Sequence, residues 1–131
     1  MIENSSGNIV LDSDIKLDDD EASRYREGIV ISRDAVIIDG AGHSIDACGS
    51  TQIFRITGQN VVLKNITLKN GYSFVHEGAA IINDGKTSVS DSKFINNVCE
   101  SLNGGAIYLN EQNIRFRKCS FEGNVPDDMN I

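Results

Sequence analysis

Carboxylates are the side chains in this sequence whose chemistry could serve catalysis or calcium binding. Asp39, Asp46, Asp84 and Asp91 each follow a short apolar segment. Two carboxylates about 7–10 Å apart can act as acid and base in glycoside hydrolysis, and several together can bind calcium. All four fall in predicted turns, where Asp is favoured because its side chain bonds to the nearby backbone. The sequence therefore predicts dispersed turn carboxylates and no catalytic residue.

A second candidate surface combines a guanidinium group, an aliphatic chain and an aromatic ring. Arg55, Ile82 and Tyr108 occupy matching positions in three predicted strands. Alternation along each strand directs these side chains outward, where they would stack into a flat strip. A ring and a guanidinium suit stacking and bidentate polar contacts. We expect a carbohydrate or surface-protein ligand to contact this strip.

A recurring apolar position predicts the architecture that places these residues. Leu11, Ile37, Leu63 and Val89 follow one another at intervals of 26 residues, and Phe116 comes one residue late. Such a period with short β-type segments is typical of a solenoid. The predicted fold class is all-β, with about four coils of three strands and a partial first coil.

Alternation within the strands also predicts the interior. Like side chains from successive coils should stack at the strand spacing of ~4.8 Å. The predicted interior residues are Phe54, Ile56, Ile81, Ile107 and Leu109 on one face, Ile37, Leu63, Val89 and Phe116 on the second, and Ile45, Ile66, Leu68, Phe94 and Phe121 on the third.

Turn-forming side chains mark the corners between the strands. Asp39, Asn65 and Asp91 follow successive copies of one strand and belong to residue types that tolerate a left-handed kink. Asn97 and Asn124 occupy matching places one coil apart, where inward Asn side chains can satisfy buried backbone groups. We predict a structural turn role for all five.

The chain is predicted to form one domain with short flanking segments. Residues 1–8 are expected to be disordered, residues 9–124 to form the solenoid, and residues 125–131 to form a tail. Residues 18–26 place acids before bases without Gly or Pro, which favours a short helix that caps the N-terminal edge. The tail is short and polar, so we expect the opposite edge either to pair with another chain or to continue in a longer parent protein.

Charge and composition exclude several partners. The 131 residues include 12 Lys and Arg against 19 Asp and Glu, a net charge of −7, whereas nucleic acids and anionic membranes attract basic surfaces. No apolar run reaches the roughly 18 residues of a spanning helix, and the first residues lack a signal-peptide pattern. The spacing of Cys48, Cys99 and Cys119 supports neither a disulfide framework nor a metal site. We expect no cofactor, no metal, no nucleic acid and no membrane insertion of this segment.

Several short motifs resemble a known group of repeats. Gly104-Gly-Ala-Ile107, Gly78-Ala-Ala-Ile81 and the Phe-x-x-Asn motifs at Phe94 and Phe121 resemble the repeats of polymorphic outer-membrane-protein and adhesin-like β-helix proteins. Two segments, Ile37–Asp46 and Asn60–Gly71, are similar to large adhesin-like surface proteins of methanogenic archaea.

This resemblance covers residues 9–124 and implies a right-handed parallel β-helix of the pectin-lyase type. It also implies an extracellular, cell-surface setting and a longer parent chain. The function it implies is a non-catalytic module for adhesion or presentation. Two alternatives stay open: a polysaccharide lyase or glycoside hydrolase of the pectin-lyase-like fold, and a purely structural stalk segment.

Overall fold

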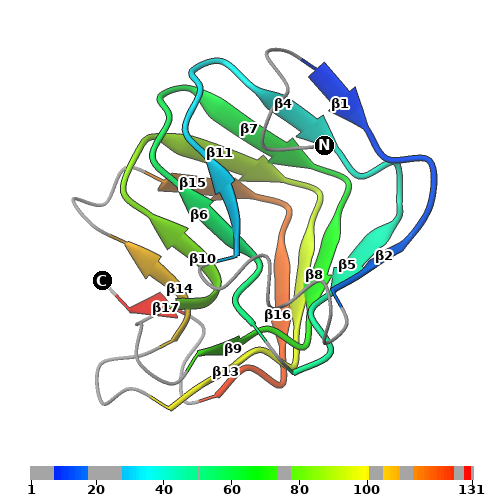
Figure 1. Cartoon of the computed structure of the whole chain (residues 1–131), viewed down its shortest axis with the longest axis vertical. Coiled ribbons are helices and arrows are strands. Elements are labelled where there is room, and N and C mark those ends of the chain that lie inside the picture. The colour runs from blue at the N-terminus through cyan, green and yellow to red at the C-terminus, as the bar shows by residue number, and fades with distance from the viewer. Residues whose placement is uncertain are drawn as a thin grey trace.

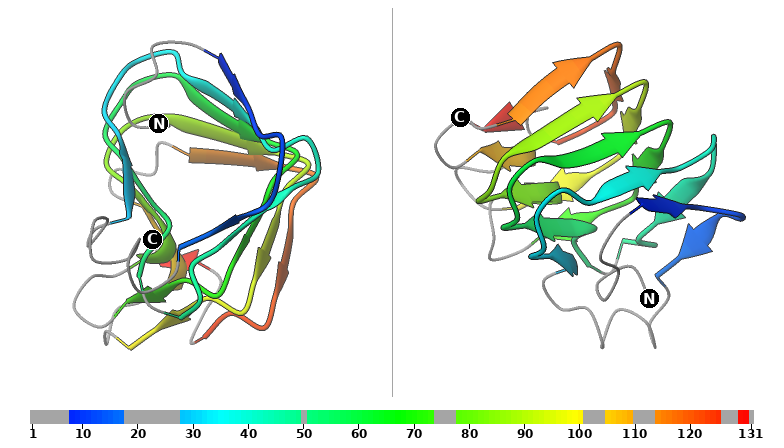
Figure 2. Two further views of the ribbon diagram at one scale, coloured as in Figure 1. Left: turned by 45° about the vertical axis from the view of Figure 1, so that its right-hand side comes forward. Right: turned by 90° about the horizontal axis from the view of Figure 1, so that it is seen from above.

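The computed structural model describes residues 8–17, 28–49, 51–73, 78–100, 105–109, 114–125 and 129–130. In these residues the chain forms three five-stranded parallel sheets and no helix. The sheets enclose a three-sided solenoid, whose cross-section is visible in Figure 1 and in the left panel of Figure 2. The predicted all-β parallel solenoid is therefore confirmed.

The chain visits the three sheets in turn. Sheet A contains β1 (Asn8–Val10), β4 (Ile37–Asp39), β7 (Val61–Lys64), β11 (Thr87–Ser90) and β15 (Ile114–Arg117). Sheet B contains β2 (Ile15–Lys16), β5 (Ser44–Asp46), β8 (Thr67–Lys69), β12 (Lys93–Ile95) and β16 (Ser120–Glu122). Sheet C contains β3 (Ile29–Ile31), β6 (Phe54–Ile56), β10 (Gly78–Asn83), β14 (Gly105–Leu109) and β17 (Met129–Asn130). A two-stranded sheet of β9 (Tyr72–Ser73) and β13 (Val98–Cys99) lies between sheets B and C.

Parallel register stacks like side chains into columns inside the solenoid. In sheet A, Leu63 pairs with Val89, which pairs with Phe116. In sheet B, Phe94 pairs with Phe121, and their rings stack with centroids 4.8 Å apart and an interplanar angle of 8°. Because this separation equals the spacing between strands, backbone pairing and ring stacking are satisfied together.

In β4, the residue that points into the interior lies one position later than predicted. Ile38 pairs with Leu63 and is fully buried, whereas the predicted interior residue Ile37 pairs with Val62 and is only partly buried. Ile37 and Ile38 are both apolar, so the alternation of side chains along the strand fits either of them as the interior residue. The coil from Ile38 to Leu63 spans 25 residues instead of 26, so the interior position falls on Ile38 and not on Ile37.

The ends of the domain also differ in detail from the prediction. Asn8, placed in the disordered N-terminus (residues 1–8), begins β1. Met129–Asn130, placed in the tail (residues 125–131), form β17 and pair with β14. The helix predicted at residues 18–26 lies outside the described residues. No helix among the described residues is long and apolar enough to cross a membrane.

Candidate functional site

Described residues line a hollow on the outside of the solenoid at each of two corners between sheets. The A–B corner is the set of connections between sheets A and B, and the B–C corner is the set between sheets B and C. The hollow at the A–B corner has a volume of about 460 Å³ and is lined by Asp39, Ala41, Gly42, Asn65, Ile66, Thr67, Asp91 and Lys93. The hollow at the B–C corner has a volume of about 390 Å³ and is lined by Asp46, Cys48, Gly49, Asn70, Gly71, Tyr72, Asn96 and Val98.

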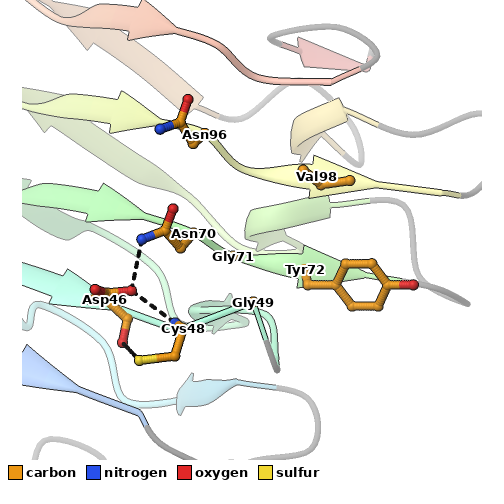
Figure 3. A pocket seen from close by; sticks show the side chains of 8 residues that line it. All are labelled: Asp46, Cys48, Gly49, Asn70, Gly71, Tyr72, Asn96 and Val98. Atoms are coloured by element: carbon orange, nitrogen blue, oxygen red, sulfur yellow. Dashed lines mark hydrogen bonds between the residues drawn. The ribbon is translucent and has the colours of Figure 1, made fainter.

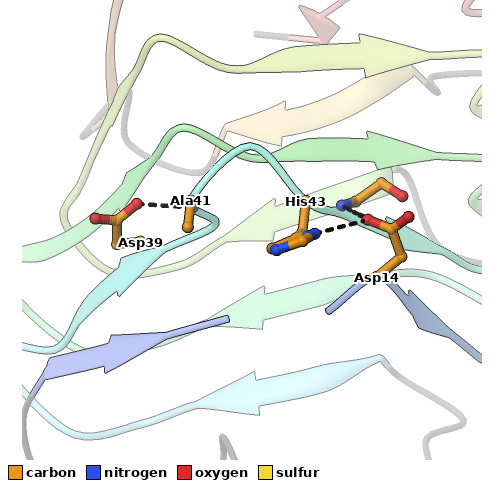
Figure 4. A network of polar contacts seen from close by, with 5 residues as sticks. Asp14, Asp39, Ala41 and His43 are labelled. Carbon is orange, nitrogen blue, oxygen red and sulfur yellow. Dashed lines mark hydrogen bonds and ion pairs between the residues drawn. The ribbon is translucent and has the colours of Figure 1, made fainter. Parts of the chain in front are cut away.

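The A–B corner turns the chain through left-handed residues. Asn65 and Asp91 have φ angles of 53° and 50°, and Lys118 continues the column with 54°. Asp39 instead lies in β4, where its Oδ1 accepts hydrogen bonds from the Ala41 amide (2.8 Å) and from Asn65 Nδ2 (3.4 Å). Figure 4 shows the Asp39 contact with Ala41. Asp39 and Asp91 line the same hollow, and Asn65 lies in the coil between them.

A polar contact links the first two coils beside this corner. Asp14 Oδ1 accepts a hydrogen bond from the Ser44 amide at 2.9 Å and lies 3.2 Å from His43 Nδ1 (Figure 4). The pKa of Asp14 is lowered, mainly because the Ser44 amide stabilises the carboxylate, with a smaller contribution from His43. The contact joins residues 29 apart in the sequence, so it depends on how the coils stack.

The B–C corner also holds a left-handed column. Cys48, Asn70 and Asn96 have φ angles of 56°, 56° and 54°. Asp46 Oδ1 accepts hydrogen bonds from the Cys48 amide (2.8 Å) and from Asn70 Nδ2 (2.9 Å), as Figure 3 shows. Partial burial opposes ionisation of Asp46, but the bonds from Asn70 and Cys48 and the charge of Lys69 lower its pKa overall.

Tyr72 supplies the aromatic ring of this hollow. It lies in β9, and Figure 3 shows its ring extending outward beyond the turn that carries Asn70. The Tyr72 hydroxyl donates a hydrogen bond to the Glu100 carboxylate, and this bond raises the pKa of Tyr72. The contact joins side chains from successive coils and holds the far end of the ring in place.

A ladder of asparagines supports the corner from inside. Fully buried Asn97 accepts a hydrogen bond from the Gly71 amide at 2.8 Å and donates to the Leu68 carbonyl at 3.2 Å. Asn124 repeats this arrangement one coil later, since its Oδ1 accepts from the Asn97 amide and its Nδ2 donates to the Phe94 carbonyl, both at 3.0 Å. The backbone beneath the hollow is therefore held by side chains as well as by strand pairing.

The strip predicted from the sequence occupies one column of sheet C. Ile82 pairs with Arg55 on one side and with Tyr108 on the other. The Ile82 side chain is buried, with 8% exposure, and Arg55 forms an ion pair with Asp84 (Nε to Oδ2, 3.5 Å). The Tyr108 side chain lies outside the described part of the chain.

Among the described residues, no group of three or more His, Cys, Asp or Glu side chains could hold a metal ion. Asp46, Asp84 and the pair Asp39 and Asp91 lie at different corners. Of the two hollows, the one at the B–C corner is lined by an aromatic residue, Tyr72, as well as by polar side chains.

Comparison with known proteins identifies the family. Residues 1–108 match the model of a family described as "Putative pectate lyase-like adhesive domain". No curated protein and no solved structure matches the chain. The family match spans most of the 131 residues, and the parallel solenoid is the fold that the adhesin-like resemblance implied. The chain belongs to the pectate lyase-like adhesive domain family.

Proposed function

We propose that this chain is a non-catalytic adhesive module of a cell surface and that it binds carbohydrate at the B–C corner. The observation that carries the proposal is the hollow lined by Tyr72 together with the amide side chains of Asn70 and Asn96, with the Tyr72 ring extending outward beyond the turn (Figure 3). A sugar presents C–H groups that pack on an aromatic ring and hydroxyl groups that exchange hydrogen bonds with amides.

The hollow is also organised before any ligand arrives. Asp46 holds Asn70, and Glu100 holds the Tyr72 hydroxyl. Side chains already fixed in place lose little conformational entropy on binding, which favours affinity from a small contact area. An adhesive family and an outward-facing preformed hollow together support a role in surface recognition. The cell-surface setting is part of this proposal, and a methanogenic source stays a prediction from sequence resemblance.

A glycan array followed by calorimetric titration of the best ligand tests the site. We expect Tyr72→Ala to weaken binding about tenfold or more, because it removes the ring, whereas Tyr72→Phe keeps the ring and should lose less. The comparison surface is the sheet C strip, probed by Arg55→Ala with Tyr108→Ala. Loss of binding in that double variant but not in Tyr72→Ala would show that the ligand binds at the sheet C strip. A chain that binds no glycan would favour the structural stalk.

One observation favours a second candidate, a polysaccharide-cleaving enzyme. Asp39 and Asp91 line the same A–B hollow from coils two steps apart, roughly 10 Å at the usual strand spacing, which is near the upper separation for an inverting acid and base. Incubation with acidic and neutral polysaccharides, followed by assay of new chain ends, tests this candidate. Cleavage that is lost in Asp91→Asn would establish it.

A further inference from the structure

The apolar interior of the solenoid is least covered at its two ends. Among the described residues, the partly buried apolar side chains packed against the core are Ile9 and Ile15 in the first strands and Ile114, Phe116, Cys119 and Phe121 in the last coil. Two large apolar residues that are exposed in the described part of the chain, Val10 and Val125, belong to the same end coils. Each end therefore presents an apolar layer that another layer of strands could cover.

Among the described strands, the unpaired backbone groups lie at the same places. Within the described part of the chain, β1 and β2 pair only with β4 and β5, and β15 and β16 pair only with β11 and β12. The right panel of Figure 2 shows β1 and β15 at opposite ends of the stack. The free side of a parallel strand presents a row of amide and carbonyl groups that can pair with another strand.

The register predicts what would meet if a second copy continued the stack. One inward column runs from Ile9 in β1 to Phe116 in β15, and another runs from Ile15 in β2 to Phe121 in β16. Placing β1 and β2 of a second copy on β15 and β16 sets its Ile9 over Phe116 and its Ile15 over Phe121. Apolar side chains then cover apolar side chains at both positions.

The charges of the two ends are complementary in this arrangement. The column that begins at Lys16 ends at Glu122, so Lys16 of the second copy would lie over Glu122. At the A–B corner, the last coil carries exposed Arg117 and Lys118, whereas the connection between β1 and β2 carries exposed Asp12 and Asp14.

The other pairings would not bring these opposite charges together. Two last coils facing each other would leave Asp12 and Asp14 outside the contact, and two first coils would leave Arg117 and Lys118 outside it. Complementary charges favour the correct partner, so the charge pattern favours the head-to-tail order.

We infer that this chain associates with itself end to end, with β15 and β16 of one copy pairing with β1 and β2 of the next. The contact is heterologous, because the two surfaces that meet are different. After each copy is added, β1 and β2 stay free at one end of the row and β15 and β16 stay free at the other. The assembly is therefore an open row of copies and not a closed dimer.

Sedimentation velocity of the whole chain over a wide concentration range tests this inference. We expect the average mass to rise with concentration past that of a dimer. Arg117→Glu and Asp12→Lys should each weaken association about tenfold or more, and mixing the two variants should restore it, because one native pair of edges reforms and the two reversed charges attract. The matched control is Lys64→Glu, which reverses a charge on the outside of β7 in the middle of sheet A and should leave association unchanged.

Thermal melts accompany each variant, and Lys118→Glu replaces Arg117→Glu if the latter fails to fold. A chain that stays monomeric at every concentration would overturn the inference. Association that stops at a dimer, or that survives Arg117→Glu and Asp12→Lys as well as it survives Lys64→Glu, would also overturn it, because the contact would then lie elsewhere.

Discussion

The A–B and B–C corners both turn the chain from one sheet to the next, but their connections differ in length and in what holds them. In the last three coils, two residues join sheet A to sheet B, and in each pair the first is left-handed. The second points inward, as buried Ile66 and Ser92 show. The B–C connections are longer and unequal, and two of them include the extra strands β9 and β13.

Because of this difference, the A–B corner controls the register of the strands, whereas the B–C corner can carry a binding surface. A two-residue corner with one outward and one inward residue leaves no room for slippage, so it sets the phase of the next strand. The B–C corner is held by the buried side chain of Asn97, which leaves its outer residues free to vary in number and type. Binding surfaces commonly form where a rigid scaffold carries variable connections.

The largest difference in stability between the two corners is expected when one glycine is inserted at each of them. An insertion between Asn65 and Ile66 should turn the buried Leu68 toward solvent and cost more than about 5 kcal/mol, because the phase of β8 reverses. The same insertion between Cys48 and Gly49 should cost much less. Urea unfolding followed by circular dichroism measures both, and equal losses would show that the B–C corner also controls register.

Truncation of one apolar side chain at each corner sharpens the comparison. Ile66→Ala removes a side chain with 2% exposure and should lower the free energy of unfolding by about 2–5 kcal/mol. Val98→Ala removes a partly buried side chain beside the B–C hollow and should cost less than about 1 kcal/mol. Thermal denaturation of the two variants under the same conditions should rank them in this order, and the reverse order would contradict the distinction.

Asparagines at the two corners should contribute differently. Asn97→Ala leaves the Gly71 amide and the Leu68 carbonyl without their side-chain partner and should cost about 1–3 kcal/mol. Asn65→Ala chiefly places Ala in a left-handed conformation, which costs about 1 kcal/mol. Native-state hydrogen exchange at Gly71 should speed up in Asn97→Ala and stay unchanged in Asn65→Ala. Unchanged exchange in both variants would remove the supporting role of Asn97.

The smallest expected effect concerns pH. The pKa of Asp46 is lowered from 3.8 in the folded chain, so its ionised form adds stability above that pH, and this stability is lost as the pH falls through the folded value. Asp46→Asn should therefore melt slightly below the parent chain at neutral pH and approach it in acid. A melting difference that stays constant from neutral pH to below pH 3.8 would show that the Asp46 charge does not contribute.

Much of the fold was predictable because the interior repeats an apolar pattern. The columns through Leu63, Val89 and Phe94 follow from period and alternation alone. The error at Ile37 arose where consecutive apolar residues left the phase undetermined and where the coil to Leu63 spans 25 residues instead of 26. Local patterns carry strand identity, but they do not carry the number of residues that a corner will accommodate.

The candidate site was much less predictable. The contact of Asp46 with Asn70 joins residues 24 apart, and that of Tyr72 with Glu100 joins residues 28 apart, so neither follows the 26-residue interval. Both depend on how the unequal B–C connections overlie one another. The two-residue strands β9 and β13 are too short for alternation to reveal them. A Tyr near Asn-Gly carried no signal of its own before the coils were stacked.

The parallel register also determines how the module would respond to mechanical tension. Hydrogen bonds between strands run along the stacking direction, so a pull on the two ends along that direction loads a few bonds at a time and peels off coils in sequence. Each coil of about 26 residues, the separation of Gly71 and Asn97, would release about 85–95 Å of extended chain. A pull across the stack would instead shear many bonds at once. An attachment that yields in steps along one direction and resists along the other follows from the same stacking that builds the interior.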